Sequence, residues 1–529
     1  YEYTSNPHDA SQQSLNSLAS VPGVFEFRNP KTDKNNFGPR VGFAYTPDFG
    51  DGFFGKVFGA PGESSIRGGF GISYNVNFQN LIHLGLPPQY RDTLYLGSAC
   101  SVANPPDWCD TGSGFLQEGG FPNTLNPPTT AEEARAVTDW LIVDQVSPRT
   151  STWTFGIQRE FAQKYVLEIR SLGTHTEHLP VQKALNTITV FENNPNLELP
   201  TYFSNSSVPG MVSLSAPSLA DFYGAMDVRY SSEGFYDWVW AFPPDGSSIY
   251  HAGSFDLHRR FTGGVQMRAN YTWSRTIDYS TNVLRTSYVN PRRPQDHYNV
   301  SNDRGFSAVD IPHKFSLSWI YELPGYGSGS SFVRQGLEGW QISGTFLAQS
   351  GQPVTALSGQ DSNGDFDTAG DRALLNPNGS GMTGTGVNYV LRDPETGATT
   401  IASDYGSSSE VVGYVAIDPN AKFVVAMPGT PDDEKRVGRN TVRSMGLNNW
   451  NIAVFKKFTV RQDKYFQFRV EFYNAFNHRQ YSLGLPSYQQ FMDNALSSTY
   501  ANVSSPLFLD AMQFSGGNRG IQMGLKFIF

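Results

Sequence analysis

Charged side chains are scarce in this chain, and long apolar runs are missing from it. Asp, Glu, Lys and Arg make up 16% of the 529 residues, against about 25% in an average soluble domain. No stretch of about 18 apolar residues exists that would cross a bilayer as a helix, and the mean hydropathy is −0.38. These absences exclude a helical membrane protein. The net charge of −9 and the lack of a long basic run also argue against nucleic acid as a partner.

Cysteine is nearly absent. The two cysteines, Cys100 and Cys109, lie close together in the Pro-containing stretch CSVANPPDWC. Two neighbouring cysteines with no other candidate for pairing favour a local disulfide formed in an oxidising compartment. Two free thiols are the alternative.

Catalytic motifs are missing as well. No HExxH, GxSxG or P-loop occurs in the sequence. Residues 50–55 spell GxGxxG, but no βαβ pattern surrounds them, so a turn is expected there. Carboxylates are plentiful, yet no pair is singled out for acid–base chemistry. We therefore predict that the chain is not an enzyme.

What the chain has instead is aromatic side chains in strict period-two alternation. Phe, Trp and Tyr reach 14% of the residues. The final segment is representative, with one face formed by Ile521, Met523, Leu525, Phe527 and Phe529 and the other by Gln522, Gly524, Lys526 and Ile528. Alternation of this kind predicts strands with one apolar and one polar face. Helical periodicity is scarce, and its best example is the short stretch near residues 130–141.

About eleven strands are expected, and the links between them alternate in length. The strands are placed at 37–47, 64–74, 151–161, 165–172, 248–259, 263–274, 313–323, 340–350, 447–458, 465–474 and 519–529. The short links are 162–164, 260–262 and 459–464, with the somewhat longer 48–63 and 324–339. The long links are 75–150, 173–247, 275–312, 351–446 and 475–518. Short periplasmic turns and long external loops are typical of outer-membrane barrels.

This order of links also predicts where the sheet starts. If the last strand ends in the periplasm, the first of eleven strands also descends, and residues 1–36 begin outside. Bacterial single-chain barrels have even strand numbers, so an odd count implies strands upstream of this chain. The VFEFR stretch near residue 25 is a candidate for one further strand.

A soluble β-sandwich is the physical alternative, because its strands also alternate apolar and polar residues. Three features favour the barrel. Strand lengths cluster near the 9–11 residues or so that a tilted strand needs to cross a bilayer, and the alternation continues to the final Phe529. Aromatic residues also gather toward strand ends, as an interfacial girdle requires: Tyr271, Trp273, Trp319, Tyr321, Trp340 and Trp450.

Several segments carry a family resemblance. They are Asn35–Pro47 (NNFGPRVGFAYTP), Ser65–Tyr74 (SIRGGFGISY), Arg259–Asp278 (RRFTGGVQMRANYTWSRTID), Asp310–Gly325 (DIPHKFSLSWIYELPG), Val437–Phe458 (VGRNTVRSMGLNNWNIAVFKKF) and Phe466–Tyr481 (FQFRVEFYNAFNHRQY). In this order they resemble the barrel of large TonB-dependent receptors that carry a carboxypeptidase-regulatory-like N-terminal domain. The final strand, with Phe527 and Phe529, resembles the signal read by the barrel-assembly machinery.

The resemblance implies an all-β, antiparallel transmembrane barrel of 22 strands in the outer membrane of a Gram-negative bacterium. Residues 1–529 would form the C-terminal part of its barrel domain, with the plug and the energy-coupling segment lying upstream. The implied partners are outer-membrane lipid, the barrel-assembly machinery, the TonB complex acting through the upstream region, and an unidentified small or oligomeric ligand. Membership of a receptor family does not name that ligand.

Charged residues on the polar faces of the strands should point into the lumen, because a charge facing lipid near mid-bilayer costs about 2–4 kcal/mol. They are Arg268, Arg469, Glu471 and Lys526. Solvation and structure explain them better than a ligand role. The long loops carry the aromatic residues Tyr223, Tyr236, Trp238 and Trp240. Loop packing is favoured over sugar or peptide stacking for these.

One loop has a sharper pattern, DSNGDFDTAGDR from Asp361 to Arg372. Its alternate oxygen-bearing residues resemble the start of a Ca²⁺ loop, and the candidate ligands are Asp361, Asn363, Asp365, Asp367 and Asp371. The pattern departs from the EF-hand because Phe366 stands at the glycine position and Arg372 at the twelfth. The loop is either a structural Ca²⁺ staple or an acidic loop without metal; no other cofactor is expected.

The leading functional hypothesis is TonB-dependent import of a ligand bound by the external loops. A passive porin-like barrel and a secreted or surface β-rich adhesin or glycan-binding module are the alternatives. Only the adhesin predicts a water-soluble chain without a lipid-facing belt.

Overall fold

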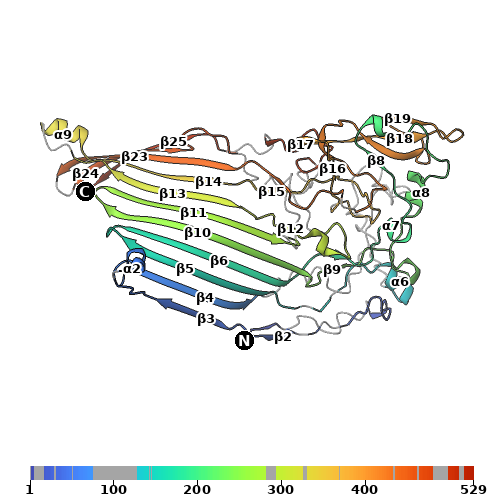
Figure 1. Cartoon of the computed structure of the whole chain (residues 1–529), viewed down its shortest axis with the longest axis horizontal. Helices are drawn as coiled ribbons and strands as arrows, with labels where there is room; N and C mark the ends of the chain where they lie inside the picture. Colours follow the sequence, from blue (N-terminus) through green and yellow to red (C-terminus); the bar gives the residue numbers. More distant parts are fainter. Residues whose placement is uncertain are drawn as a thin grey trace, which may run out of the picture.

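One large antiparallel sheet dominates the computed structural model, which describes the chain except residues 1, 5–16, 29–30, 32, 51, 76–127, 142, 145, 281–292, 326–329, 369, 433–434, 462–463, 481–498 and 512–516 (Figure 1). Each strand pairs with its sequence neighbour within this sheet. The strands are β3 (Arg40–Tyr45), β4 (Ser64–Tyr74), β5 (Arg149–Phe161), β6 (Tyr165–Leu179), β10 (Gly246–Thr262), β11 (Val265–Asp278), β13 (His313–Glu322), β14 (Trp340–Gln349), β23 (Leu447–Arg461), β24 (Lys464–Tyr473) and β25 (Gly520–Ile528). A short strand, β12 (Gly305–Phe306), pairs with the end of β11. The eleven strands coincide with the eleven predicted ones.

The links confirm the predicted alternation of length. The hairpin β10–β11 turns at Gly263 and Gly264, whose positive φ values of 60° and 76° favour glycine. Two longer links on the same side contain the short helices α2 (Phe53–Phe58) and α9 (Ser331–Leu337). Figure 1 shows all these short links at its left-hand end and the long loops at the opposite end. We call these the short-turn end and the long-loop end.

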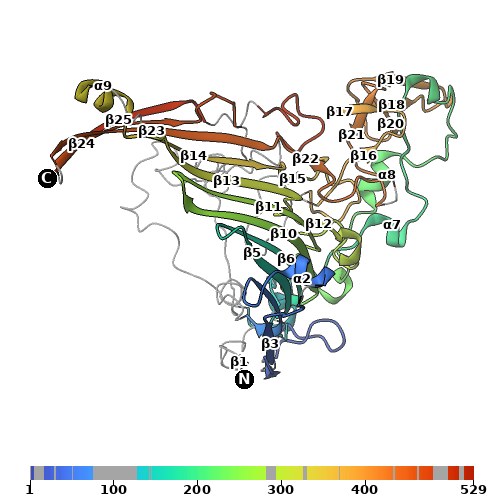
Figure 2. The ribbon, with the colours of Figure 1, turned by 60° about the vertical axis from the view of Figure 1, so that its left-hand side comes forward.

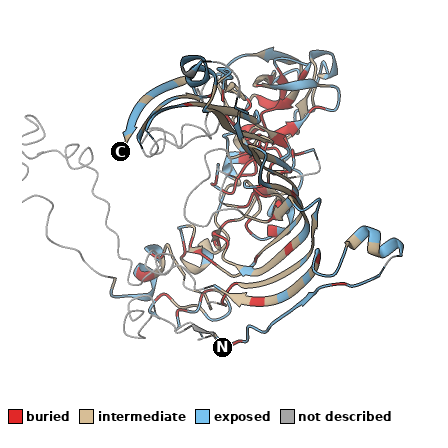
Figure 3. Ribbon diagram, turned by 90° about the vertical axis from the view of Figure 1, so that its left-hand side faces the viewer, coloured by how far each residue is buried: buried red, intermediate tan, exposed pale blue. Residues whose placement is uncertain are grey.

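The two faces of the sheet differ in polarity, as the alternation predicts. Apolar residues meet across strands, for example Leu317 of β13 with Ala269 and Phe346. The described residues leave this face exposed at β25, where the exposed fractions of Met523 and Leu525 are 68% and 69%. A β-sandwich would cover exactly these positions, so the structure excludes that alternative. Figure 3 shows the sheet curved into an arc whose strands are mostly intermediate or exposed.

Aromatic rings gather toward the strand ends. At the short-turn end Phe161 stacks on Tyr165 with ring centroids 5.3 Å apart, and Phe466 lies 4.6 Å from Phe527. Toward the long-loop end, Phe346 stacks on Trp450 at 4.1 Å. Two aromatic rows of this kind fit the two interfaces of a bilayer.

The long loops fold together into a compact body, here called the loop assembly (Figure 2). Its strands are β7 (Lys183–Ala184), β8 (Thr201–Tyr202), β9 (Trp240–Ala241), β15 (Pro353–Val354), β16 (Leu374–Leu375), β17 (Ser380–Thr385), β18 (Val387–Arg392), β19 (Thr399–Ala402), β20 (Val411–Ala416), β21 (Ala421–Val424) and β22 (Val442–Arg443). Its α-helices are α6 (Ala131–Ala136), α7 (Val190–Asn193) and α8 (Leu219–Gly224), and its 3₁₀ turns span Asn205–Ser207, Ser231–Glu233 and Val300–Asp303.

All five buried hydrophobic clusters found in the described part of the chain lie outside the eleven long strands. One cluster combines Phe25 with Phe235, whose rings meet edge-on at 4.9 Å. The residues around Phe25 therefore lie beside the long loops, in agreement with the predicted external start. The VFEFR stretch makes only an isolated bridge between Val21 and Phe25, so the further strand considered there is not formed.

The sheet is open, because β3 and β25 each pair with one neighbour among the strands described. A separate small sheet joins β1 (Glu2–Thr4) to β2 (Asp33–Asn36). No helix within the described ranges is long and apolar enough to cross a membrane.

The bare apolar face yields a direct test. In the full-length protein, Leu317→Arg should lower the free energy of unfolding from lipid by about 2–4 kcal/mol, because it places a charge in hydrocarbon. Urea titration of protein folded into liposomes would measure this. Ser318→Arg, one residue along on the polar face, is the matched control and should cost far less. Equal effects of the two substitutions would contradict the assignment of the faces.

Candidate functional site

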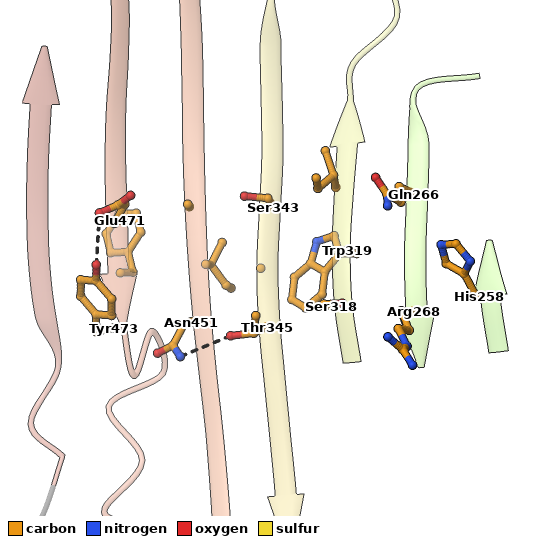
Figure 4. A pocket seen from close by; sticks show the side chains of 15 residues that line it. His258, Gln266, Arg268, Ser318, Trp319, Ser343, Thr345, Asn451, Glu471 and Tyr473 are labelled. Atoms are coloured by element: carbon orange, nitrogen blue, oxygen red, sulfur yellow. Dashed lines mark hydrogen bonds between the residues drawn. The ribbon is translucent and has the colours of Figure 1, made fainter. Parts of the chain in front are cut away.

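The polar face of the central strands is hollowed. A hollow of about 530 Å³ crosses β10, β11, β13, β14, β23 and β24 (Figure 4). Arg268, Ser318, Thr345 and Asn451 line it, and they also line a second hollow of about 550 Å³. The two hollows are therefore continuous along one face of the sheet.

Strand register explains how these side chains meet. Arg268 pairs with Ser318, Ser318 with Thr345, and Thr345 with Asn451, so the four form one row across adjacent strands. Asn451 Nδ2 donates to Thr345 Oγ1 at 3.3 Å. Because side chains alternate between faces, a one-residue slip would turn the whole row to the opposite side.

Charges on this face pair locally. Arg268 Nε donates to Asp256 Oδ2 at 3.0 Å, and Arg469 lies 3.8 Å from Glu471. Tyr473 donates from its hydroxyl to Glu471 at 3.2 Å. The Arg268 side chain is 66% exposed, so its pair contributes little stability. Its guanidinium presents hydrogen-bond donors to the hollow.

The residues predicted to face the lumen share this face. Arg268 and Glu471 line the first hollow. Arg469 lies two positions from Glu471, and Lys526 lies two positions from Gly524, the partner of Arg469. Sequence reasoning did not single out Asp256, although its place opposite Asn270, beside the His258–Arg268 pair, follows once the register is known.

Buried ion pairs join the segments 275–312 and 351–446 at the long-loop end. Arg439 bonds the carboxylate and carbonyl of Asp278, the last residue of β11. Arg372 Nη1 lies 3.0 Å from Asp303 Oδ1, and Arg443 pairs with Asp310. Both members of the Arg439–Asp278 pair are about 5% exposed. These ion pairs, largely shielded from water, thus hold the loop assembly to the long-loop end of the sheet.

The acidic loop 361–371 lies within this assembly. Asp361 accepts three main-chain hydrogen bonds, from Gly364 at 2.8 Å, Asp365 at 3.2 Å and Phe366 at 2.9 Å. Burial raises the pKa of Asp361. Its carboxylate therefore holds the turn of the loop.

The other candidate ligands differ in their surroundings. Asn363 is fully buried and donates to Asp432 at 2.8 Å. Asp367 faces Arg293 at 2.7 Å. Asp365 and Asp371 are both buried; burial first, and nearby carboxylates second, raise the pKa of each well above its usual value. No three His, Cys, Asp or Glu side chains surround one point in the described ranges.

The remaining predicted residues are the two cysteines and the C-terminal phenylalanines. Cys100 and Cys109 lie outside the described residues. Phe527 is on the apolar face of β25, and its ring stacks 5.9 Å from that of Phe529; their role as an assembly signal stays a prediction.

Of the loop aromatics, Trp238 and Trp240 meet edge-on at 5.0 Å. Tyr223 and Tyr236 are exposed. Packing therefore accounts for the two tryptophans, while the two tyrosines remain available at the surface.

Comparison with known proteins finds one family. The model of a family described as outer membrane beta barrel domain matches residues 1–507. No curated protein sequence matches the chain.

Solved structures of outer-membrane transporters resemble the chain weakly. FpvA of P. aeruginosa, in complex with ferric pyoverdine, is 9% identical with a TM-score of 0.36, over 94% of this chain and 34% of that one. YddB from Escherichia coli is 8% identical with a TM-score of 0.31, over 88% and 38%. The FrpB iron transporter from Neisseria meningitidis is 10% identical with a TM-score of 0.35, over 94% and 40%. The chain thus spans 34–40% of the length of these proteins.

The buried pairs of the loop assembly can be tested by removing one partner. Arg439→Met should destabilise the assembly by about 3–5 kcal/mol, because it removes the buried guanidinium that pairs with the buried carboxylate of Asp278. Resistance of the long loops to protease in the full-length protein would report this.

The double variant Arg439→Met, Asp278→Asn should recover much of the loss, since no buried charge then remains. Arg170→Met is the matched control: it removes an exposed arginine 3.0 Å from Glu168 and should cost under about 1 kcal/mol. Similar sensitivity of Arg439→Met and Arg170→Met would contradict a structural role for the buried pair.

Proposed function

The chain belongs to the outer membrane beta barrel domain family, and on this premise we propose that it forms part of the wall and the external loop assembly of a TonB-dependent importer. The family places the chain in the outer membrane. The ligand binds the loop assembly and then passes along the polar face of the sheet.

One observation supports this proposal most directly. The large sheet has an exposed apolar face on one side and a hollowed polar face on the other. Hydrocarbon is the solvent that matches exposed positions such as Leu525, and an aqueous lumen matches the row from Arg268 to Asn451. A surface adhesin has no use for such an apolar face, which argues against that alternative.

The open edges support a larger barrel. Each unpaired main-chain group in hydrocarbon costs several kcal/mol, so β3 and β25 require partner strands. Further strands of the same protein supply them in this proposal and close the barrel. A barrel of about 22 strands is wide enough to need a plug, and a plug distinguishes an importer from a passive pore.

The loop assembly supports ligand capture on the outside. By the orientation usual for outer-membrane barrels, the long loops face the exterior. Exposed Tyr223 and Tyr236 lie on this assembly, and side chains with an apolar ring and a polar tip are suited to contact with ligands. The polar row below them offers hydroxyl, amide and guanidinium groups for passage.

The proposal is tested by conductance and by binding to TonB. The full-length protein should fractionate with the outer membrane and require detergent for extraction. In planar bilayers it should give no steady ion conductance, because a plug fills the lumen, and it should bind the periplasmic domain of TonB. A passive porin would conduct steadily and would not bind TonB; that outcome would replace the importer by a pore. Extraction without detergent would refute both.

A further inference from the structure

Segment 361–371 places several carboxylates where water is excluded. Asp365 and Asp371 are 3% and 1% exposed, and Asn363 between the acidic residues is fully buried. An ionised carboxylate removed from water is costly unless a cation or hydrogen bonds compensate it. The question is what compensates these two.

Neighbouring arginines do not suffice. Arg293 is engaged by Asp367 at 2.7 Å, and Arg372 by Asp303 at 3.0 Å. Arg436, another described arginine beside the loop, lies 3.4 Å from Asp432.

The acidic and basic side chains described around the loop differ in number. Among the described residues, the carboxylates that act electrostatically on Asp365 or Asp371 are those of Asp361, Asp367 and Asp432, and the guanidinium groups that pair with Asp367 and Asp432 are those of Arg293 and Arg436. His297 lies 3.4 Å from Asp367 and already accepts a hydrogen bond from the amide of Ala184 through Nδ1. Among the described residues, carboxyl groups therefore outnumber guanidinium groups around this loop.

One oxygen lacks any partner. Asp371 Oδ2 accepts from the amide of Ser362 at 2.9 Å, whereas Oδ1 is buried and accepts no hydrogen bond from the residues that the structure places. A buried acceptor left unsatisfied costs about 1–3 kcal/mol. The negative charge of Asp371 also disfavours ionisation of Asp365, so a cation bound by both carboxylates would relieve the repulsion and the unsatisfied oxygen together.

The main chain already has the shape of a cation loop. Asp361 fixes the first turn through its three hydrogen bonds, and Asp365 accepts from the amide of Asp367 at 2.8 Å. Phe366 has a φ of +68°, the left-handed conformation for which an EF-hand loop uses glycine at its sixth position. Phenylalanine at this position therefore keeps the turn rather than abolishing it.

We propose that segment 361–371 binds one Ca²⁺ through the carboxylates of Asp365 and Asp371. The amide oxygen of Asn363, which also accepts from the amide of Asp365 at 3.1 Å, and main-chain carbonyls of the described loop residues complete the shell, since three acidic side chains do not converge there among the described residues. A purely oxygen set with irregular geometry suits Ca²⁺, whereas Mg²⁺ demands a near-ideal octahedron and Zn²⁺ prefers nitrogen and sulfur. Asp367 is left to Arg293.

The bound ion would join separate loops of the assembly. The carbonyl of Asn363 accepts from the amide of Val190 at 3.0 Å, and Gly364 lies against Val190 and Phe222 of the segment 180–245. Fixing Asn363 therefore also fixes α7 and α8 against the segment 351–446. Sites of extracellular modules bind Ca²⁺ with dissociation constants of about 10⁻⁴–10⁻³ M, which is the range expected here.

Calorimetric titration of the full-length protein in detergent, freed of divalent ions, tests the proposal with Ca²⁺ itself as the probe. The protein should bind Ca²⁺ with a dissociation constant in this range. Asp365→Asn and Asp371→Asn should each weaken binding at least tenfold. Asp404→Asn, which changes an exposed aspartate of the same segment, is the matched control and should bind as the unmodified protein does. No binding at several millimolar Ca²⁺, or unchanged binding by both variants, would overturn the proposal.

Protease resistance of the long loops guards against misfolded variants. In a chelator, Asp365→Asn should be at least as resistant as the unmodified protein, because it removes one of two repelling charges. Addition of Ca²⁺ should then protect the unmodified protein several-fold and Asp365→Asn hardly at all. If Mg²⁺ protects equally well, or if the unmodified protein is fully resistant in chelator, the carboxylates are satisfied without Ca²⁺ and the proposal fails.

Discussion

The architecture of this protein depends on the requirement that every main-chain N–H and C=O inside hydrocarbon be paired. Eleven strands meet this requirement with their neighbours, in an unbroken antiparallel order from β3 to β25. Side-chain alternation then separates the two solvents: apolar groups such as Leu317 turn to lipid, and the row through Ser318 and Thr345 turns to the lumen. Among the described strands, β3 and β25 at the two edges each have a single partner, which is why we propose that further strands close the barrel.

The loop assembly is stabilised differently from the membrane-spanning sheet. There the hydrophobic clusters are buried by protein, and the buried polar groups include ion pairs such as Arg372–Asp303 and hydrogen-bonded amides such as that of Asn376. Arg439 binds Asp278 where β11 leaves the sheet, so a buried charge pair holds the loop assembly to the sheet. Such a pair adds little net stability, but it tolerates few alternative arrangements. The external surface is accordingly an ordered body on which a ligand meets fixed groups.

Sequence reasoning predicted the sheet well because its pattern is local. Period two within about ten residues located all eleven strands, and the lengths of the links assigned the two ends. The strand extensions were missed: β6 continues to Leu179 and β11 to Asp278, beyond the stretches in which regular alternation marks the strand. The small strands of the loop assembly were missed for the same reason. The pair Arg439–Asp278 spans 161 residues, and no periodicity links positions so far apart. The acidic loop was singled out by its spacing as a candidate Ca²⁺ site, which stays a prediction, and the engagement of Asp367 by Arg293 needed the structure.

The very short turn between β10 and β11, closed by Gly263 and Gly264, has a consequence for biogenesis. Contacts within such a hairpin are local in sequence, and local contacts form quickly because little chain entropy is lost in closing them. Insertion into the membrane can thus proceed hairpin by hairpin. Each hairpin adds two strands whose main-chain hydrogen bonds to each other are already formed. The distant contacts of the loops come together only once their parent hairpins stand side by side. The loop assembly therefore folds after the strands have paired. Its contacts can form only when the strands beneath it are in register.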